Sequence, residues 1–237
     1  MMTDRDARSN VASILAIVCA ALAVVFLASL HVLSPEYSPA WRMISEYANG
    51  HYPWVLSLMF VAYGLSILSL TYAIRNQAAT RASRVGLVLL AVSGVAAVSA
   101  AQFDLNQAAV HELAGILGIL CLPVGAMLVT RALVRTERWS NARQPLLWMA
   151  NLTWISVVLW AASFVLMVAT FVHVLGALPT SVPKEVPSGA IALVGWTNRL
   201  VVLSAWAWTA AVAWVAIRVR DRSLSAQSTP DAISARG

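Results

Sequence analysis

Charge is scarce in this chain of 237 residues: charged side chains make up 11% of it, and its 16 basic residues include a single lysine, Lys184. Hydrophobic residues account for 60%, and the mean hydropathy is +0.75. Soluble domains carry about 25% charged residues and about 45–50% apolar ones. These values exclude an ordinary soluble globular domain.

Cysteine is also rare, with only Cys19 and Cys121, each in the middle of an apolar run. This placement excludes a disulfide framework and predicts that both act as small packing residues. No two histidines stand at the spacing of metal ligands, because even the nearest pair, His31 and His51, is separated by a whole connection. We therefore predict neither a metal site nor a cofactor.

Long apolar runs are what the sequence has in abundance. A hydrocarbon core about 30 Å thick requires about 20 mostly apolar residues for one helical crossing. Runs of this kind lie near 11–33, 53–74, 85–102, 111–133, 146–172 and 190–217. Their continuity excludes the alternating pattern of a membrane barrel. The sequence predicts an all-α, polytopic bundle of six transmembrane helices over 11–217.

The charges between these runs are sorted by side. Thirteen of the 16 basic residues fall in the tail 1–10, the second and fourth connections and the tail 218–237. The positive-inside rule then places both termini in the cytoplasm. Because the arginines are scattered over four short stretches, the net charge of +6 indicates topology and attraction to anionic lipids, not a nucleic-acid partner. We expect membrane lipids as partners and a disordered tail 218–237.

The first outer connection, 34–52, has helix signals of its own. Ser38-Pro39 is a typical helix start, and Asn49-Gly50 is a typical stop. We predict a short amphipathic helix over 39–48 that lies on the outer membrane surface or folds over the bundle. Arg42 and Glu46 are four residues apart and are expected to form a weak pair.

Arg199 is the most informative polar residue, because it lies one to three turns inside the last apolar run. An arginine at that depth costs a few kcal/mol unless it is paired or hydrated. One interpretation is a salt bridge that locks helix ends, or snorkelling to the headgroups; the candidate partners are Asp104, Glu112 and Glu46. The other is an anion-binding arginine in an outward-facing cavity.

His111 is the most interesting of the four histidines, all of which fall on the outer rim. It precedes Glu112 and lies four residues before Gly115, on the same helix face, where a gap leaves room for a ligand or a neighbouring helix. Its near-neutral pKa suits a general base, and Asp104 is the other candidate for that role. The candidate ligand-binding residues are Glu46, Asp104, His111, Glu112, Asn198 and Arg199.

Three strings along the chain resemble a known family. They are Ser38-Pro39 with Ile44-Ser45-Glu46-Tyr47-Ala48, after a span that ends His31-Val32-Leu33; Phe103-Asp104 with His111-Glu112-Leu113-Ala114-Gly115; and Gly195-Trp196-Thr197-Asn198-Arg199-Leu200. Together they resemble the bacterial family called domain of unknown function 998. The resemblance implies a six-span protein of the bacterial inner membrane whose recurrent polar positions lie on the outer rim, and it implies no established activity.

Three functional hypotheses follow. The first is an outward-facing polar pocket that binds a lipid headgroup or a small anion. The second is a hydrolase-like enzyme at the outer leaflet that uses His111 or Asp104 as its base. The third is a structural or accessory bundle, in which the same polar residues only lock helix ends together.

Overall fold

A computed structural model describes residues 4–102, 108–177, 183 and 185–234, the side chains of 108–112 and 223–234 excepted. It contains six long helices: α1 (Asp4–Leu33), α2 (Pro53–Ile74), α3 (Arg81–Ala100), α4 (Ala108–Leu133), α5 (Arg143–Leu175) and α6 (Val194–Ser234). Each includes a segment long and apolar enough to cross a membrane. The prediction of a six-helix, all-α membrane protein is confirmed.

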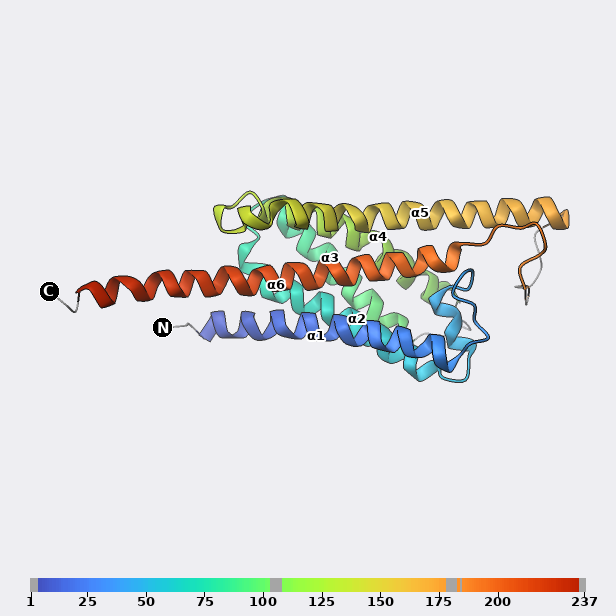
Figure 1. The fold of residues 1–237 in the computed structure, drawn as a ribbon, viewed down its shortest axis with the longest axis horizontal. Helices are drawn as coiled ribbons and strands as arrows, with labels where there is room; N and C mark the ends of the chain where they lie inside the picture. The colour runs from blue at the N-terminus through green and yellow to red at the C-terminus, as the bar shows by residue number, and fades with distance from the viewer. Residues whose placement is uncertain (1–3, 103–107, 178–182, 184, 235–237) are drawn as a thin grey trace.

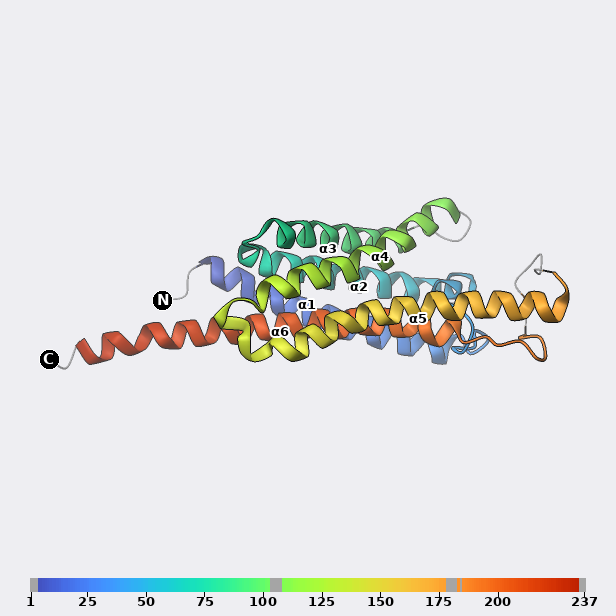
Figure 2. The same cartoon turned by 90° about the horizontal axis from the view of Figure 1, so that it is seen from above.

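The helices run up and down beside one another in a closed arrangement (Figures 1 and 2). Each helix packs against the next one in the chain, and α6 returns to pack against α1. A further contact between α2 and α6 crosses the centre of the bundle. Helix α5 contacts mainly α6 and α4, so much of its surface faces outward.

Small residues allow the central helices to approach closely. Helix α3 crosses α4 where Gly86 faces Gly125, and a Cβ atom on Gly125 would lie 2.9 Å from the carbonyl oxygen of Gly86. A buried serine adds a bond to the same contact, since Ser93 Oγ donates to the carbonyl oxygen of Gly118 at 2.9 Å. Close backbone approach and interhelical hydrogen bonds are the usual means of helix association in lipid.

Hydrogen bonds between hydroxyl groups also join α5 to α6. Ser156 and Ser204 lie 2.9 Å apart, and Ser163 and Thr197 lie 2.6 Å apart. These bonds fix the register of α6, and therefore the position of Arg199 at its start.

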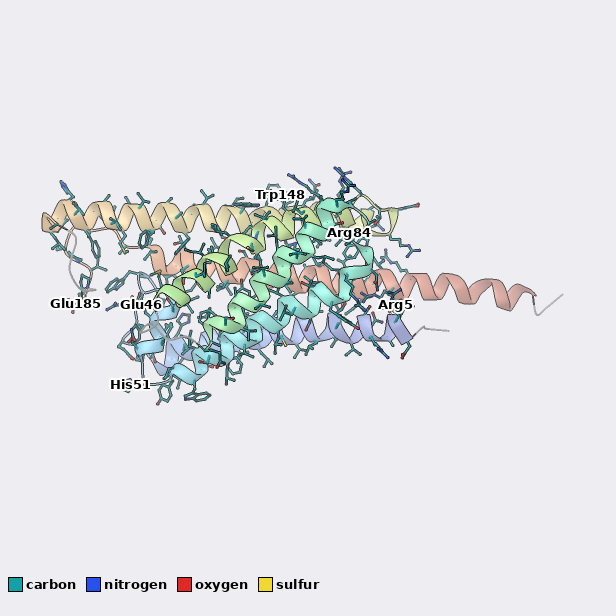
Figure 3. The ribbon with its side chains drawn as sticks, turned by 180° about the vertical axis from the view of Figure 1, so that it is seen from behind. Arg5, Glu46, His51, Arg84, Trp148 and Glu185 are labelled. Carbon is teal, nitrogen blue, oxygen red and sulfur yellow. The ribbon has the colours of Figure 1, made fainter. Side chains whose placement is uncertain are left out.

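The two ends of the bundle differ in character. Arg5 and Arg84 lie toward one end, whereas Glu46, His51 and Glu185 lie at the other (Figure 3). We call the first the basic end; it holds the connections 75–80 and 134–142. We call the second the loop end; it holds the connections 34–52 and 176–193.

The connection 34–52 differs from the expected amphipathic helix over 39–48. The chain makes one turn at 38–42, becomes extended at Met43 and then forms a 3-10 helix, η1 (Ile44–Asn49). The reason is tertiary. The carbonyl oxygen of Ala40 accepts from the backbone of α6, and the Ile44 amide donates to Asn198, so these groups are not available to a continuous helix.

The tails also differ from expectation. Helix α1 begins at Asp4, within the expected tail 1–10, and α6 continues to Ser234 rather than ending at 217. For α6, no glycine or proline interrupts 218–229, and half of these residues are Arg, Leu, Ala or Gln, which favour helices.

Candidate functional site

The connection 34–52 packs into the loop end of the bundle. Its apolar side chains Trp41, Ile44 and Tyr47 are all buried, and Tyr47 is 0% exposed. Of the two placements expected for this segment, the structure therefore has the one that folds over the bundle.

Gly195, in the first turn of α6, is the point of closest contact with this connection. Its amide donates to the carbonyl oxygen of Ala40 at 3.0 Å. A Cβ atom on Gly195 would lie 2.4 Å from the carbonyl oxygen of Pro39 and 2.7 Å from that of Arg42. Only glycine fits here without displacing the backbone of the connection.

Arg199 lies one turn further along α6, with 2% of its surface exposed. Its Nε atom donates to His31 Nε2 at 2.8 Å. Its Nη1 atom donates to the carbonyl oxygens of Arg42 at 2.8 Å and Gly195 at 3.0 Å, and its Nη2 atom donates to Tyr47 Oη at 3.1 Å. One side chain thus joins α1, the connection 34–52 and α6.

This geometry constrains the protonation of His31. Because Nε2 accepts a hydrogen bond from Arg199, that nitrogen carries no proton, and the neutral ring must carry its proton on Nδ1. The phenol of Tyr47 is neutral as well: burial raises its pKa, although the nearby guanidinium of Arg199 acts in the opposite direction. The groups that accept hydrogen bonds from Arg199 in the described part of the chain are therefore neutral.

Of the three carboxylates expected beside Arg199, only that of Glu46 lies in the described part of the chain. No ion pair among the described residues includes Arg199. Glu46 pairs instead with Arg42 at 2.7 Å, as expected from their spacing, and its second oxygen accepts from the Met43 amide at 2.8 Å. Asp104 lies outside the described residues. His111 and Glu112 lie on α4, but their side chains are outside the described part.

Asn198 completes the contact between α6 and the connection. Its Oδ1 atom accepts from the Ile44 amide at 3.0 Å. Of the six candidate residues, the structure therefore brings Glu46, Asn198 and Arg199 to the same connection. Each of the three stabilises its fold.

A cavity of about 380 Å³ lies directly below this connection, among α2, α3, α4, α5 and α6. Met43, Ile44 and Ser45 form one edge of it, and Asn198 lines it as well. Most of the remaining wall is apolar, with Phe60, Ala97, Ile119, Val201 and Val202 among its residues. The arrangement is an apolar chamber with polar groups at its edge.

The gap expected beside Gly115 belongs to this cavity. Gly115 and Gly118 both line it, and a Cβ atom on either would meet nothing within 4 Å among the described residues. Another lining residue, Trp160, carries a buried indole N–H that has no hydrogen-bond partner in the described part of the chain. The cavity therefore has free space, and one of its lining residues carries a buried donor without a described partner.

Among the residues whose side chains the structure describes, no three His, Cys, Asp or Glu side chains lie close enough together to hold a metal ion.

A comparison with family models gives a match over residues 17–215, to a family described as protein of unknown function (DUF998). The chain belongs to the DUF998 family. No curated protein and no solved structure matches it. This match confirms the resemblance that the three sequence strings indicated.

Reasoning from the sequence missed three residues of this DUF998 site. Tyr47 and Gly195 both lie within the strings that resemble the family, so those strings contained the signal, but no spacing indicated that the two strings meet. His31 precedes the first string, at the end of a span, and was otherwise treated as one of four histidines on the rim. Its contact with Arg199 joins residues 168 positions apart in the sequence.

Proposed function

We propose that this DUF998 protein binds a membrane lipid in the cavity below the connection 34–52. The observation that carries the proposal is the cavity itself, whose volume of about 380 Å³ lies within the 300–1,000 Å³ typical of ligand sites. Its apolar wall suits a hydrocarbon chain. Its edge at Ser45 and Asn198 suits the polar part of a lipid.

The unpartnered indole N–H of Trp160 supports the same ligand class. A buried donor without an acceptor is costly, and such groups in native proteins usually have a ligand, water or ion as partner. Because the indole nitrogen is buried in this structure, the ring would have to turn before this donor could meet an ester or hydroxyl oxygen of a bound lipid.

The contacts of Arg199 favour a structural role for this residue. Its bonds to His31, Arg42, Gly195 and Tyr47 hold the connection 34–52 over the cavity. We therefore assign Arg199 to the cover of the site, and His111, Glu112 and Asp104 stay candidates for contact with a headgroup. Direct binding of an anion by Arg199 stays the alternative.

The charge pattern supports an orientation for the site. The basic end carries the connections in which arginine accumulates, and the positive-inside rule assigns such an end to the cytoplasm. We propose that both termini are cytoplasmic, that the membrane is the bacterial plasma membrane, and that the cavity opens toward the outer leaflet.

Filling the cavity tests the proposal. In the double variant Gly115→Leu/Gly118→Leu, the new side chains enter free space, so the fold should persist while the lipid is excluded. A matched control is Val158→Phe, which enlarges an outward-facing side chain on α5 that does not line the cavity. The measurement is native mass spectrometry of protein purified in mild detergent, with identification of the lipid that is retained.

We expect the wild type and Val158→Phe to retain one lipid. The affinity of the filled variant for this lipid should be lower by roughly ten-fold or more, because the loss of an apolar contact readily costs the corresponding binding energy of about 1.4 kcal/mol. Equal retention by the filled variant, together with an unchanged fold, would contradict the proposal and favour the structural-bundle hypothesis.

A further inference from the structure

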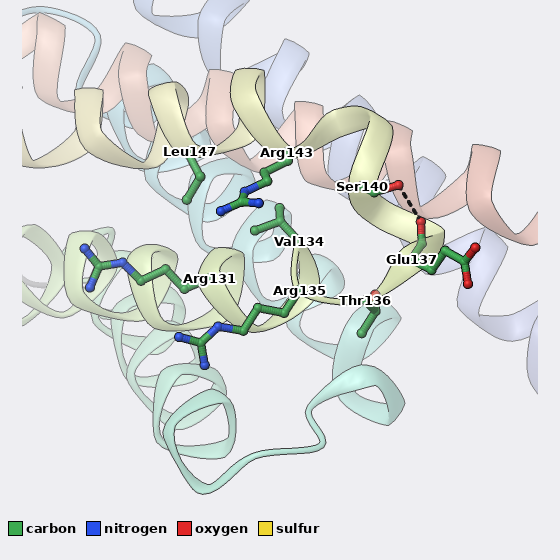
Figure 4. Close-up of a pocket in the computed structure, with 8 residues that line it drawn as sticks. All are labelled: Arg131, Val134, Arg135, Thr136, Glu137, Ser140, Arg143 and Leu147. Atoms are coloured by element: carbon green, nitrogen blue, oxygen red, sulfur yellow. Dashed lines mark hydrogen bonds between the residues drawn. The ribbon is translucent and has the colours of Figure 1, made fainter.

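A second cavity, of about 510 Å³, lies at the basic end between the end of α4 and the start of α5. Three arginines line it: Arg131, Arg135 and Arg143. Their side chains extend to the same side of the pocket, and the carboxylate of Glu137 lies on the other side (Figure 4). The pocket therefore has a cationic face.

These three arginines are not used by the fold. All three are exposed, and none forms a hydrogen bond or an ion pair with any residue that the structure describes. Other arginines at the same end are engaged, for example Arg220, which donates to Ser9, Asn10, Ser13 and Ala73. Topology alone requires positive charge at this end, but not three free guanidinium groups around one cavity.

The donors that an anion would meet are the guanidinium groups. The hydroxyl groups of Thr136 and Ser140 also line the pocket, but each already donates to a backbone carbonyl oxygen, at 2.7 Å in both cases. Arginine forks match the geometry of phosphate oxygens. The free donors of the pocket therefore suit the oxygens of a phosphate group.

The frame of the pocket is rigid. Trp139, in the 3-10 helix η4 (Glu137–Ala142), is 2% exposed, and its indole N–H donates to Gln77 Oε1 at 2.8 Å. This bond ties the segment between α4 and α5 to the connection 75–80. The arginines thus project from a fixed backbone.

The surroundings distinguish a lipid from a soluble anion. Val134 and Leu147 give the pocket an apolar wall. Trp148, the next residue on α5, is 66% exposed, as is typical of a tryptophan at the headgroup level of a membrane. Beyond it, the outward face of α5 is apolar, with Leu152, Ile155 and Leu159 exposed.

We propose that this pocket binds the phosphate-bearing headgroup of an anionic phospholipid, whose chains lie along the outward face of α5. Three arginines opposite one carboxylate leave two positive charges in excess, so a headgroup with two phosphates, as in diphosphatidylglycerol, fits best. Basic pockets between transmembrane helices on the cytoplasmic side commonly take such lipids. This site is separate from the cavity below the connection 34–52, since it lies at the other end of the bundle.

The test compares two triple variants that lose the same charge. Arg131→Gln/Arg135→Gln/Arg143→Gln removes the cationic face. The control, Arg5→Gln/Arg81→Gln/Arg84→Gln, removes three exposed arginines that do not line the pocket. The delipidated full chain is titrated with diphosphatidylglycerol, phosphatidylglycerol, phosphatidylcholine or inorganic phosphate, and binding is followed by native mass spectrometry and by the shift in Tm.

We expect the wild type and the control to prefer diphosphatidylglycerol over phosphatidylcholine, and the pocket variant to bind it roughly 100-fold more weakly, since each arginine near an anionic lipid contributes about five-fold. Equal weakening in both triple variants would show diffuse surface charge and overturn the proposal. Saturation by inorganic phosphate alone would overturn the assignment to a lipid. If the triple variant does not fold, Arg143→Gln alone should weaken binding about five-fold, and an unchanged affinity in that variant would refute the site.

Discussion

Gly195→Ala is the sharpest test of how the connection 34–52 is held on the bundle. The added Cβ atom would lie 2.4 Å from the carbonyl oxygen of Pro39 and 2.7 Å from both the carbonyl oxygen of Arg42 and the amide nitrogen of Trp41. All three are backbone atoms, so no side-chain rotation relieves the clash. The connection must move away from α6.

The magnitude follows from what that movement breaks. Overpacking of this kind costs about 1–3 kcal/mol. The connection also forms hydrogen bonds to α6 at Ala40, Arg42 and Ile44, and each bond lost costs about 1 kcal/mol. Replacing glycine by alanine in a helix gains only about 0.5–1 kcal/mol, so the steric term decides the sign. We expect a net loss of about 2–5 kcal/mol.

The assay is the free energy of unfolding in mixed detergent micelles, with hydrogen–deuterium exchange over 38–49 as the local readout. Gly115→Ala is the matched control, because a Cβ atom there meets nothing within 4 Å among the described residues, and it should be neutral or slightly stabilising. If Gly195→Ala and Gly115→Ala were equally stable, with equal exchange over 38–49, the proposed role of this contact would be refuted.

Two further predictions concern Arg199 and Tyr47. Arg199→Leu leaves the carbonyl oxygen of Arg42 and the Tyr47 hydroxyl without their donor, so the free energy of unfolding should fall by about 2–4 kcal/mol. The stability of Arg199→Lys should lie between that of Arg199→Leu and that of the wild type. An Arg199→Leu protein that is fully stable and loses only ligand-dependent stabilisation would instead support anion binding. Burial raises the pKa of Tyr47, so its contribution to stability should be complete below the unfolded pKa of about 10 and should be lost as the pH rises through the folded pKa. Unfolding measured at increasing pH should show this loss in the wild type, and its persistence in Tyr47→Phe would exclude Tyr47 as the cause.

The membrane fold was predictable from sequence because the hydrogen bonds that a helix needs in lipid form within each spanning segment. Each spanning segment must satisfy its own backbone hydrogen bonds, so a continuous apolar run is enough to indicate a helix. The run 53–74, for example, corresponds to α2 (Pro53–Ile74). The Arg42–Glu46 pair was predictable for the same reason, since its partners are four residues apart.

The site was only partly predictable because its contacts are distant in sequence. The depth of Arg199 indicated that it needed partners, but local sequence could not show that His31 and Tyr47 would be among them. The shape of 38–49 is determined by bonds such as that between Ile44 and Asn198, which are 154 positions apart. No local propensity contains that information.

Helix α5 places a demand on the membrane itself. Its 33 residues extend about 50 Å, whereas a typical hydrocarbon core is about 30 Å thick. It reaches beyond the other helices at the loop end (Figure 1), where Val172, Val174 and Leu175 remain exposed and apolar. Because the bonds to α6 prevent α5 from tilting alone, this hydrophobic mismatch must be relieved by tilting the whole bundle or by thickening the bilayer beside α5. We therefore expect the tilt of this bundle to depend on the thickness of the bilayer.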